Sequence, residues 1–145
     1  MFRVIRDTRE QKGWDFETTA DCSGFTVGKL DTGDYAIEGI EDLCIERKGC
    51  VGELAGNFTE DRWKNVLERM SKFKHAYIIC EFEVKDVVTY PYNMPKVARA
   101  KIKIKGPYLL KNITEAEIKY GVRFVFAGKY GKQYFMSLAK RLCQK

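Results

Sequence analysis

Residues 32–48 read TGDYAIEGIEDLCIERK. Two short segments, 35–37 and 43–48, predict a pair of β-strands joined through a hairpin-like turn at 38–42. Side chains at positions i and i+2 leave the same face of a strand, so Glu46 and Lys48 are expected to point into one pocket while Arg47 points away. Asp34, just before the first of these strands, can reach the same pocket. The segment therefore predicts a site that holds two carboxylates and a lysine.

This set of side chains suits phosphodiester hydrolysis. Two carboxylates can hold a hard divalent cation such as Mg2+, which prefers oxygen ligands and keeps several of its waters. A neighbouring lysine can position or polarise one of those waters beside a phosphate. The spacing alone is weak evidence, because in a chain with 32% charged residues it more often marks a solvated face.

Four segments, taken in order, strengthen the hypothesis. They are DTREQ at 7–11, TGDY at 32–35, IERK at 45–48 and ELAG at 53–56. In this order they resemble the XPF-type nuclease family, a branch of the PD-(D/E)xK superfamily whose signature reads GD…ERK-xxx-D. The resemblance covers nearly the whole chain. It implies a restriction-endonuclease-like fold, which is an α/β domain with a mixed central sheet and helices on both faces.

The resemblance also implies an activity and roles for single residues. It suggests a DNA endonuclease dependent on Mg2+ (or Mn2+), acting on branched, flapped or junction DNA in repair, recombination or phage DNA processing. Asp34 and Glu46 would ligate the metal, and Lys48 would position the water. Asp7 and Glu53 would support the metal or its water, while Arg9, Glu10 and Arg47 would orient phosphate or brace the acids.

One position departs from the family signature. In the signature, three residues separate ERK from the aspartate, so the aspartate is expected at position 52. Gly52 occupies that position, and the nearest acid is the next residue, Glu53. Because 54–56 match what normally follows that aspartate, a one-residue insertion within 49–52 would let Glu53 take its role. The competing interpretation is that the site lacks this acid and that Glu53 is only a charge near the start of a helix.

The family further suggests partners. Its nuclease domains commonly dimerise through their late helices and strand, here residues 110–142, so a homodimer or a heterodimer of nuclease domains is expected. Its members usually carry a tandem helix-hairpin-helix module that helps select branched DNA, and this sequence resembles a stand-alone nuclease domain without it. The alternative function is a catalytically silent DNA-binding subunit of a nuclease complex. The intact Asp34, Glu46 and Lys48 favour an active enzyme.

Charge is distributed unevenly along the chain. Residues 1–89 contain 13 Lys and Arg against 18 Asp and Glu, whereas residues 90–145 contain 13 against 2. Between Tyr90 and Thr114 there is no acid, and six basic residues are the expected DNA-binding set: Lys96, Arg99, Lys101, Lys103, Lys105 and Lys111. Apolar and basic residues alternate over 98–105, which predicts a strand or extended arm with one basic face. The alternative is an edge strand kept soluble by lysines.

Hydrophobic periodicity predicts the remaining elements. We expect a first strand at 2–5 with Asp7 at its end, a polar stretch to about residue 24, a buried strand at 76–82 and another strand at 122–127. Helices are expected from residue 57 or 59, from Pro107 to Tyr120 with Gly121 as the stop, and at 132–142. The first helix would bury Trp63, Val66, Leu67, Met70 and Phe73.

Length and composition fit a single nuclease domain over residues 1–145. With 45% hydrophobic residues, a chain of 145 residues can bury one core. The five cysteines show no metal-ligand spacing, which favours buried thiols in a reducing compartment. No segment approaches the ~20 apolar residues of a membrane span, and the N-terminus lacks a signal peptide pattern. We therefore expect no membrane partner and a cytoplasmic protein, or a nuclear one in a eukaryote.

Overall fold

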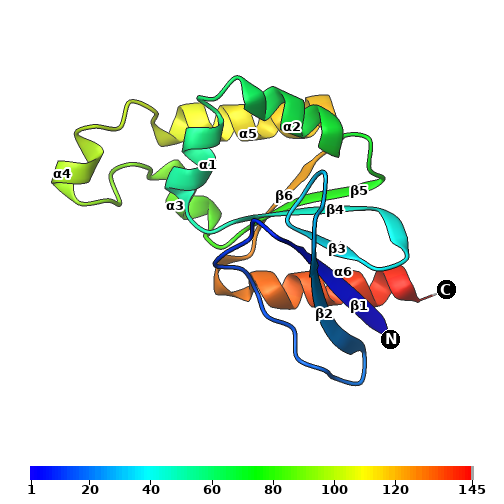
Figure 1. The fold of residues 1–145 in the computed structure, drawn as a ribbon. Helices are drawn as coiled ribbons and strands as arrows, with labels where there is room; N and C mark the ends of the chain where they lie inside the picture. Colours follow the sequence, from blue (N-terminus) through cyan, green and yellow to red (C-terminus); the bar gives the residue numbers. More distant parts are fainter. Residues whose placement is uncertain (145) are drawn as a thin grey trace.

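The computed structural model describes residues 1–144. Its strands are β1 Phe2–Asp7, β2 Cys22–Gly28, β3 Tyr35–Ile37, β4 Ile40–Lys48, β5 His75–Cys80 and β6 Arg123–Phe126. They form one sheet in the order β2-β1-β3-β4-β5-β6 (Figure 1). β3 runs antiparallel to both β1 and β4, whereas β1–β2, β4–β5 and β5–β6 are parallel pairs. The sheet is mixed, as predicted.

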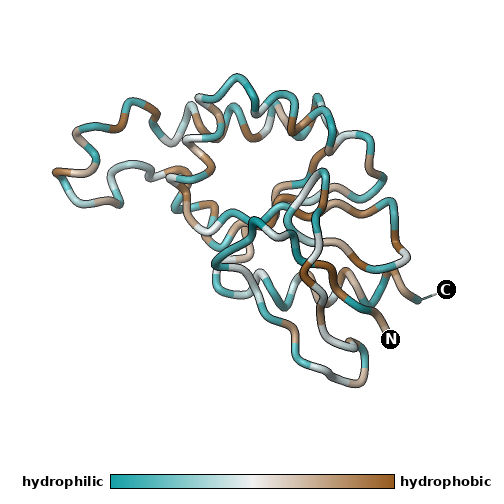
Figure 2. Tube along the Cα trace, viewed as in Figure 1, coloured by the Kyte–Doolittle hydropathy of each residue, from teal (hydrophilic) through white to brown (hydrophobic). Residues whose placement is uncertain are grey.

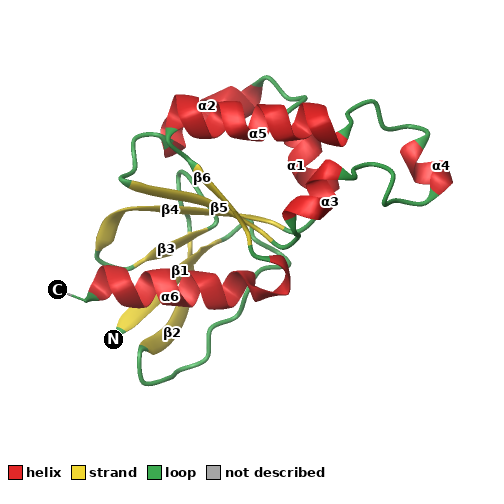
Figure 3. Cartoon of the chain, turned by 180° about the vertical axis from the view of Figure 1, so that it is seen from behind, coloured by secondary structure: helices red, strands yellow, loops and turns green. Residues whose placement is uncertain are grey.

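Helices cover both faces of this sheet. They are α1 Val51–Asn57, α2 Arg62–Met70, α3 Val84–Val88, α4 Lys96–Arg99, α5 Gly106–Tyr120 and α6 Gly131–Cys143, with a short 3-10 turn, η1, at Gly128–Tyr130. α2 and α5 lie over one face and α6 over the other (Figures 1 and 3). This arrangement confirms the predicted α/β architecture. No helix within residues 1–144 is long and apolar enough to cross a membrane.

Each face of the sheet has its own hydrophobic core, because side chains alternate along the central strands. Cys44 and Ile78 contribute to the core beneath α2 and α5, while Ile45 and Ile79 contribute to the core beneath α6. β5 is buried on both faces, as its continuous apolar run predicted. Hydrophobic colour is concentrated along the strands in Figure 2. The two cores hold β4 rigidly between its neighbours.

β2 and α1 are among the elements that were not predicted. β2 begins in the stretch expected to be polar to about residue 24, and only Cys22 and Gly24 of its residues are buried, so the alternating pattern of a strand is faint. α1 begins at Val51, well before the expected helix, and it was missed because its two glycines, Gly52 and Gly56, lower the local helix propensity. Tertiary packing of Leu54 overrides that propensity, since Leu54 is fully buried.

The long helix α5 confirms its predicted ends. Pro107 lies in its first turn, where a missing backbone N–H costs nothing. Gly121 ends the helix with φ +68°, and its N–H donates to the carbonyl of Glu117.

Of the two structures predicted for 98–105, a strand or an extended arm, the strand is wrong. Residues 96–99 form the short helix α4, and 101–105 are extended but belong to no sheet. The loop of residues 91–105, the basic arm, projects from the body (Figures 1 and 3). The N–H of Gly106 donates to the carbonyl of Tyr90 at 2.6 Å, which closes the base of the arm. Exposure alternates along this segment as the sequence pattern does. Ile102 and Ile104 pack inward, while the lysines on either side of each are exposed.

Candidate active site

Strand β4 brings Glu46 and Lys48 together on the face that carries α1 and α2. The Nζ of Lys48 lies 3.4 Å from Oε2 of Glu46, and both side chains are largely buried, at 7% and 15% exposure. A buried lysine and glutamate at this distance form a charged pair whose geometry the surrounding core fixes. The i, i+2 relationship predicted from the sequence is therefore present.

Asp34 is held in place by backbone contacts on both sides. Its N–H donates to the carbonyl of Ile45 at 2.7 Å, and its own carbonyl accepts from the N–H of Asp7 at 2.8 Å. Its side-chain Oδ2 accepts from the backbone N–H of Arg47 at 2.7 Å. Gly33, just before it, has φ +90°, and a Cβ there would lie 2.9 Å from the sulfur of Cys44. Glycine at this position lets the chain pass close enough to β4 to deliver the carboxylate.

The two acids influence each other strongly. Burial, followed by the charge of Glu46, raises the pKa of Asp34 to about 8. Burial also raises the pKa of Glu46, although Lys48 lowers it in part. Two carboxylates that repel each other in a poorly solvated pocket are stabilised by any cation placed between them. Asp34 and Glu46 therefore fit the role of Mg2+ ligands, because that ion prefers oxygen donors.

Glu53 reaches the same pocket from the first turn of α1. Its Oε1 lies 3.7 Å from Nζ of Lys48, and its Oε2 accepts from the N–H of Gly49 at 3.2 Å. Lys48 thus lies between Glu46 and Glu53. The contact supports the interpretation that Glu53 takes the place of the family aspartate, which stays a prediction.

Asp7, at the end of β1, holds Arg9 rather than facing solvent. Its Oδ1 accepts from the N–H of Leu30 at 2.8 Å, and its Oδ2 accepts from Nε of Arg9 at 2.7 Å. Burial would raise the pKa of Asp7, but the hydrogen bonds from Arg9 and Leu30 outweigh it and lower that pKa overall. Arg9 in turn lines the pocket of Glu46 and Lys48.

Arg47 points to the opposite face, as predicted, and joins two acids there. Its Nε and Nη2 each donate to Glu10 at 3.0 Å, and its Nη1 donates to Glu81. The hydrogen bonds from Arg47 to Glu10 raise the pKa of Arg47 above its ordinary value, although burial lowers that pKa in part. This bidentate pair suits bracing of the strand, one of the two roles expected for Arg47 and Glu10.

The pocket around the acids also includes residues that sequence reasoning missed. It has a volume of about 310 Å³, and α2 contributes Arg62, Asn65 and Arg69 to its wall. These three follow a spacing of i, i+3 and i+7, which places them in one stripe beside the buried face of α2. All three are exposed, and the sequence predicted only the buried side of this helix. The stripe adds positive charge beside Glu46 and Lys48, as a phosphate would require.

Most of the predicted DNA-binding residues lie on the basic arm. Lys101 and Lys103 line a shallow cavity of about 290 Å³ with Gly52 and Gly56 of α1. Because α1 also carries Glu53, it lies between the acidic pocket and the base of the arm. Lys96 and Arg99 lie on α4, and Lys105 ends the arm. Lys111 differs, since it lies on α5 and faces Glu115 at 3.9 Å.

No family model and no curated protein sequence matches the chain. Solved structures do match it. XPF from Aeropyrum pernix superposes with a TM-score of 0.66 and 18% identity, covering 99% of this chain and 65% of that one. XPF from the same organism in complex with DNA gives a TM-score of 0.63 and 18% identity, covering 97% and 64%. The chain thus spans just under two thirds of either structure.

These likenesses establish the fold. The mixed sheet and the helices on both faces define a restriction-endonuclease-like α/β fold. Within that class, the chain has the fold of the XPF nuclease domain, as its sequence predicted.

Proposed function

We propose that this chain is a metal-dependent DNA endonuclease that hydrolyses phosphodiester bonds, with branched, flapped or junction DNA as its substrate. The observation that carries the proposal is that Asp34 lies close enough to Glu46 and Lys48 for their charges to shift its pKa, while Glu46 and Lys48 line a pocket with basic walls. One of the two similar XPF structures is a complex with DNA, which is consistent with a nucleic-acid substrate for this chain.

Asp34 and Glu46 would hold Mg2+ or Mn2+, and Asp7 and Glu53 would support the site. When bound, the metal would supply positive charge to the phosphate and lower the pKa of a bound water. No group of three or more His, Cys, Asp or Glu within residues 1–144 is arranged to hold a metal. The ion would therefore take its other ligands from water and phosphate, which is usual for Mg2+.

Lys48 would position the attacking water. Its Nζ lies between the carboxylates of Glu46 and Glu53, at 3.4 and 3.7 Å, and 4.9 Å from the ring centre of Trp63. These contacts leave the ammonium group few orientations. A donor fixed in this way can direct a water toward a phosphorus atom without reorganising during the reaction.

The DNA would cross the molecule from the acidic pocket to the basic arm. Arg9, Arg62 and Arg69 surround the pocket, and Lys101 and Lys103 lie on the other side of α1. Phosphates spaced along a strand would meet positive charge at both ends of this path. Such contacts contribute affinity that does not depend on sequence.

A dimer fits the exposed apolar residues near the end of the sheet. Ile118 on α5 is 86% exposed, Tyr130 on η1 is 58% exposed, and β6 is an edge strand. We propose this region as the face for a second nuclease domain, either a copy of the chain or a related subunit.

A nicking assay tests the proposed function. Purified protein is incubated with Mg2+ or Mn2+ and with labelled linear, flapped and junction DNA of matched sequence. Product is expected with either ion, and more of it from the branched substrates. Tight binding without product on any substrate would instead identify a silent DNA-binding subunit.

A further inference from the structure

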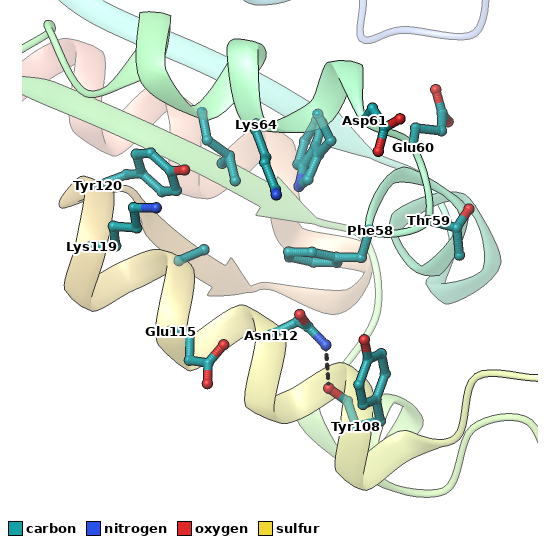
Figure 4. Close-up of a pocket in the computed structure, with 13 residues that line it drawn as sticks. Phe58, Thr59, Glu60, Asp61, Lys64, Tyr108, Asn112, Glu115, Lys119 and Tyr120 are labelled. Carbon is teal, nitrogen blue, oxygen red and sulfur yellow. Dashed lines mark hydrogen bonds between the residues drawn. The ribbon is translucent and has the colours of Figure 1, made fainter.

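A second cavity, of about 410 Å³, lies between α2 and α5 (Figure 4). Its volume falls in the range of about 300 to 1,000 Å³ that is usual for small-molecule sites. Buried apolar groups, Trp63, Leu67 and Ala116, belong to its lining. None of the residues assigned to catalysis above lines it.

Aromatic rings surround this cavity. Figure 4 shows the rings of Phe58 and Tyr108 toward one end and that of Tyr120 toward the other. Tyr108 is 55% exposed, so its ring is free to contact a ligand. Flat aromatic walls of this kind suit a planar ring system, because nucleic-acid bases stack on such side chains.

Polar groups in the lining lack partners. The indole Nε1 of Trp63 is buried and has no hydrogen-bond acceptor within residues 1–144. Asn112 donates from Nδ2 to the carbonyl of Tyr108 at 2.8 Å (Figure 4), and its Oδ1 accepts no hydrogen bond from the described part of the chain. The indole nitrogen of Trp63 has almost no accessible surface, so it is not open to a ligand in the cavity. The cavity thus offers one acceptor, the Oδ1 of Asn112, between aromatic walls.

Trp63 connects this cavity with the proposed active site. It lines both spaces, and the Nζ of Lys48 lies 4.9 Å from its ring centre. A strand whose phosphate lies near Glu46 and Lys48 would therefore have an adjacent nucleotide within reach of the cavity.

The rim of the cavity does not repel such a strand. Glu60 is paired with Arg62, and Glu115 faces Lys111. Asp61, Lys64 and Lys119 also belong to the lining, with Asp61 and Lys119 at opposite ends of the cavity in Figure 4. The local charge is nearly balanced, which suits a neutral base more than a free phosphate.

We propose that this cavity receives one unpaired nucleobase of the DNA strand bound at the active site. The proposal rests on the proposed function and makes it more specific, because the substrate must have an unpaired base beside the phosphate that is cut. Asn112 would accept from an amino or imino group of the base. The base would stack against the aromatic walls, as in other single-strand sites.

Binding to DNA with one missing base tests the proposal. A flapped DNA is made with an abasic nucleotide placed in turn at each unpaired position near the branch, and affinity is measured by fluorescence anisotropy without divalent metal. At one position the wild-type protein should bind about 5- to 100-fold more weakly without the base, which is the range measured for base stacking on aromatic side chains. Asn112→Ala should reduce the ratio of the affinity for the DNA with the base to the affinity for the abasic DNA, and it should leave the affinity for the abasic DNA unchanged.

The matched control is Thr114→Ala, an exposed residue of the same helix whose hydroxyl also bonds to a backbone carbonyl. It should keep the wild-type ratio. Tyr108→Ala, which removes an exposed aromatic ring of the lining, should reduce the ratio as Asn112→Ala does.

Two results would overturn the proposal. One is equal affinity with and without the base at every position. The other is an unchanged ratio in Asn112→Ala together with loss of a protein dimer in sedimentation, which would assign the cavity to a second copy of the chain. Cleavage of the same DNAs by the wild-type protein separates the two proposals. Equal cleavage with and without the base overturns only the base site, whereas absence of cleavage overturns the nuclease.

Discussion

The backbone N–H of Arg47 donates to the side chain of Asp34 at 2.7 Å. Asp34 is therefore positioned by the main chain of the same strand that presents Glu46 and Lys48. Any shift of β4 moves all of these groups together. Because β4 is clamped between two cores, the distance between the two acids is set by the fold and not by flexible side chains.

The free energy of unfolding should depend on pH, because burial and the charge of Glu46 raise the pKa of Asp34. The pKa of Asp34 is about 8 in the fold and 3.8 in its ordinary environment. Between about pH 4 and 8 the unfolded chain has lost this proton and the folded chain keeps it, so the free energy of unfolding should fall as pH rises through this window. In Asp34→Asn the free energy of unfolding should fall less over this window, and Glu46 should account for the part that remains. Urea unfolding of the wild type and the variant, in EDTA at pH 5 and pH 8, measures the fall in each protein.

The exposed residue Asp31 provides the control, since Asp31→Asn should leave the fall unchanged. An equally steep fall in Asp34→Asn would show that Asp34 is ionised in the folded protein at pH 5.

Two glycines with similar backbone angles should respond differently to alanine. Gly33 has φ +90° and Gly39 has φ +84°, so either substitution incurs a strain of about 1 to 2 kcal/mol. A Cβ at Gly33 would also meet the sulfur of Cys44 at 2.9 Å, whereas one at Gly39 would meet nothing within 4 Å. Gly33→Ala should therefore lose more unfolding free energy and also lose cleavage, because Asp34 is displaced. Equal stability and activity in the two variants would contradict this account of the turn.

Glu53→Gln tests the suspected insertion. If Glu53 has the role of the family aspartate, its amide should reduce cleavage as much as Asp34→Asn does, because the carboxylate beside Lys48 is lost. Glu68→Gln, on the exposed face of α2, should cleave like wild type. Normal cleavage by Glu53→Gln would leave Asp7, Asp34 and Glu46 as the only acids of the site.

The basic arm should contribute phosphate contacts. Changing Lys101 and Lys103 together to Ala should weaken duplex binding for all sequences and flatten the plot of log affinity against log salt by roughly one to two units. Changing Lys129 and Lys140, which are exposed on the η1 and α6 side, should leave the slope unchanged. An unaltered slope in the arm variant would mean that DNA is held elsewhere and that the lysines serve solubility.

Much of the site was predictable because it depends on local geometry. The two-residue period of a strand placed Glu46 and Lys48 together and Arg47 opposite, and the structure shows that arrangement. The ends of α5 were set by Pro107 and Gly121, residues whose backbone preferences act locally. The buried strand β5 followed from its continuous apolar run.

What the sequence did not reveal depends on contacts between distant segments. Alternation over 98–105 predicted a strand or an extended arm and did not decide between them, because the pattern does not show whether a neighbouring strand pairs with the segment. Arg62 and Arg69 are exposed charges, but their place in the wall of the pocket depends on how α2 lies relative to β4. The second role of Trp63, as a wall shared by two cavities, could not be distinguished from core packing by its helical spacing.

The most direct measurement of the central claim is cleavage of a flapped DNA in Mg2+ by wild type and by Glu46→Gln, with DNA affinity measured on the same preparations without metal. Glu46→Gln keeps the shape of the side chain and removes the charge that would bind the ion. The account predicts a fall in cleavage rate of about 100-fold or more, the equivalent of several kcal/mol of transition-state stabilisation, with affinity close to wild type. Cleavage at the wild-type rate by Glu46→Gln would contradict it.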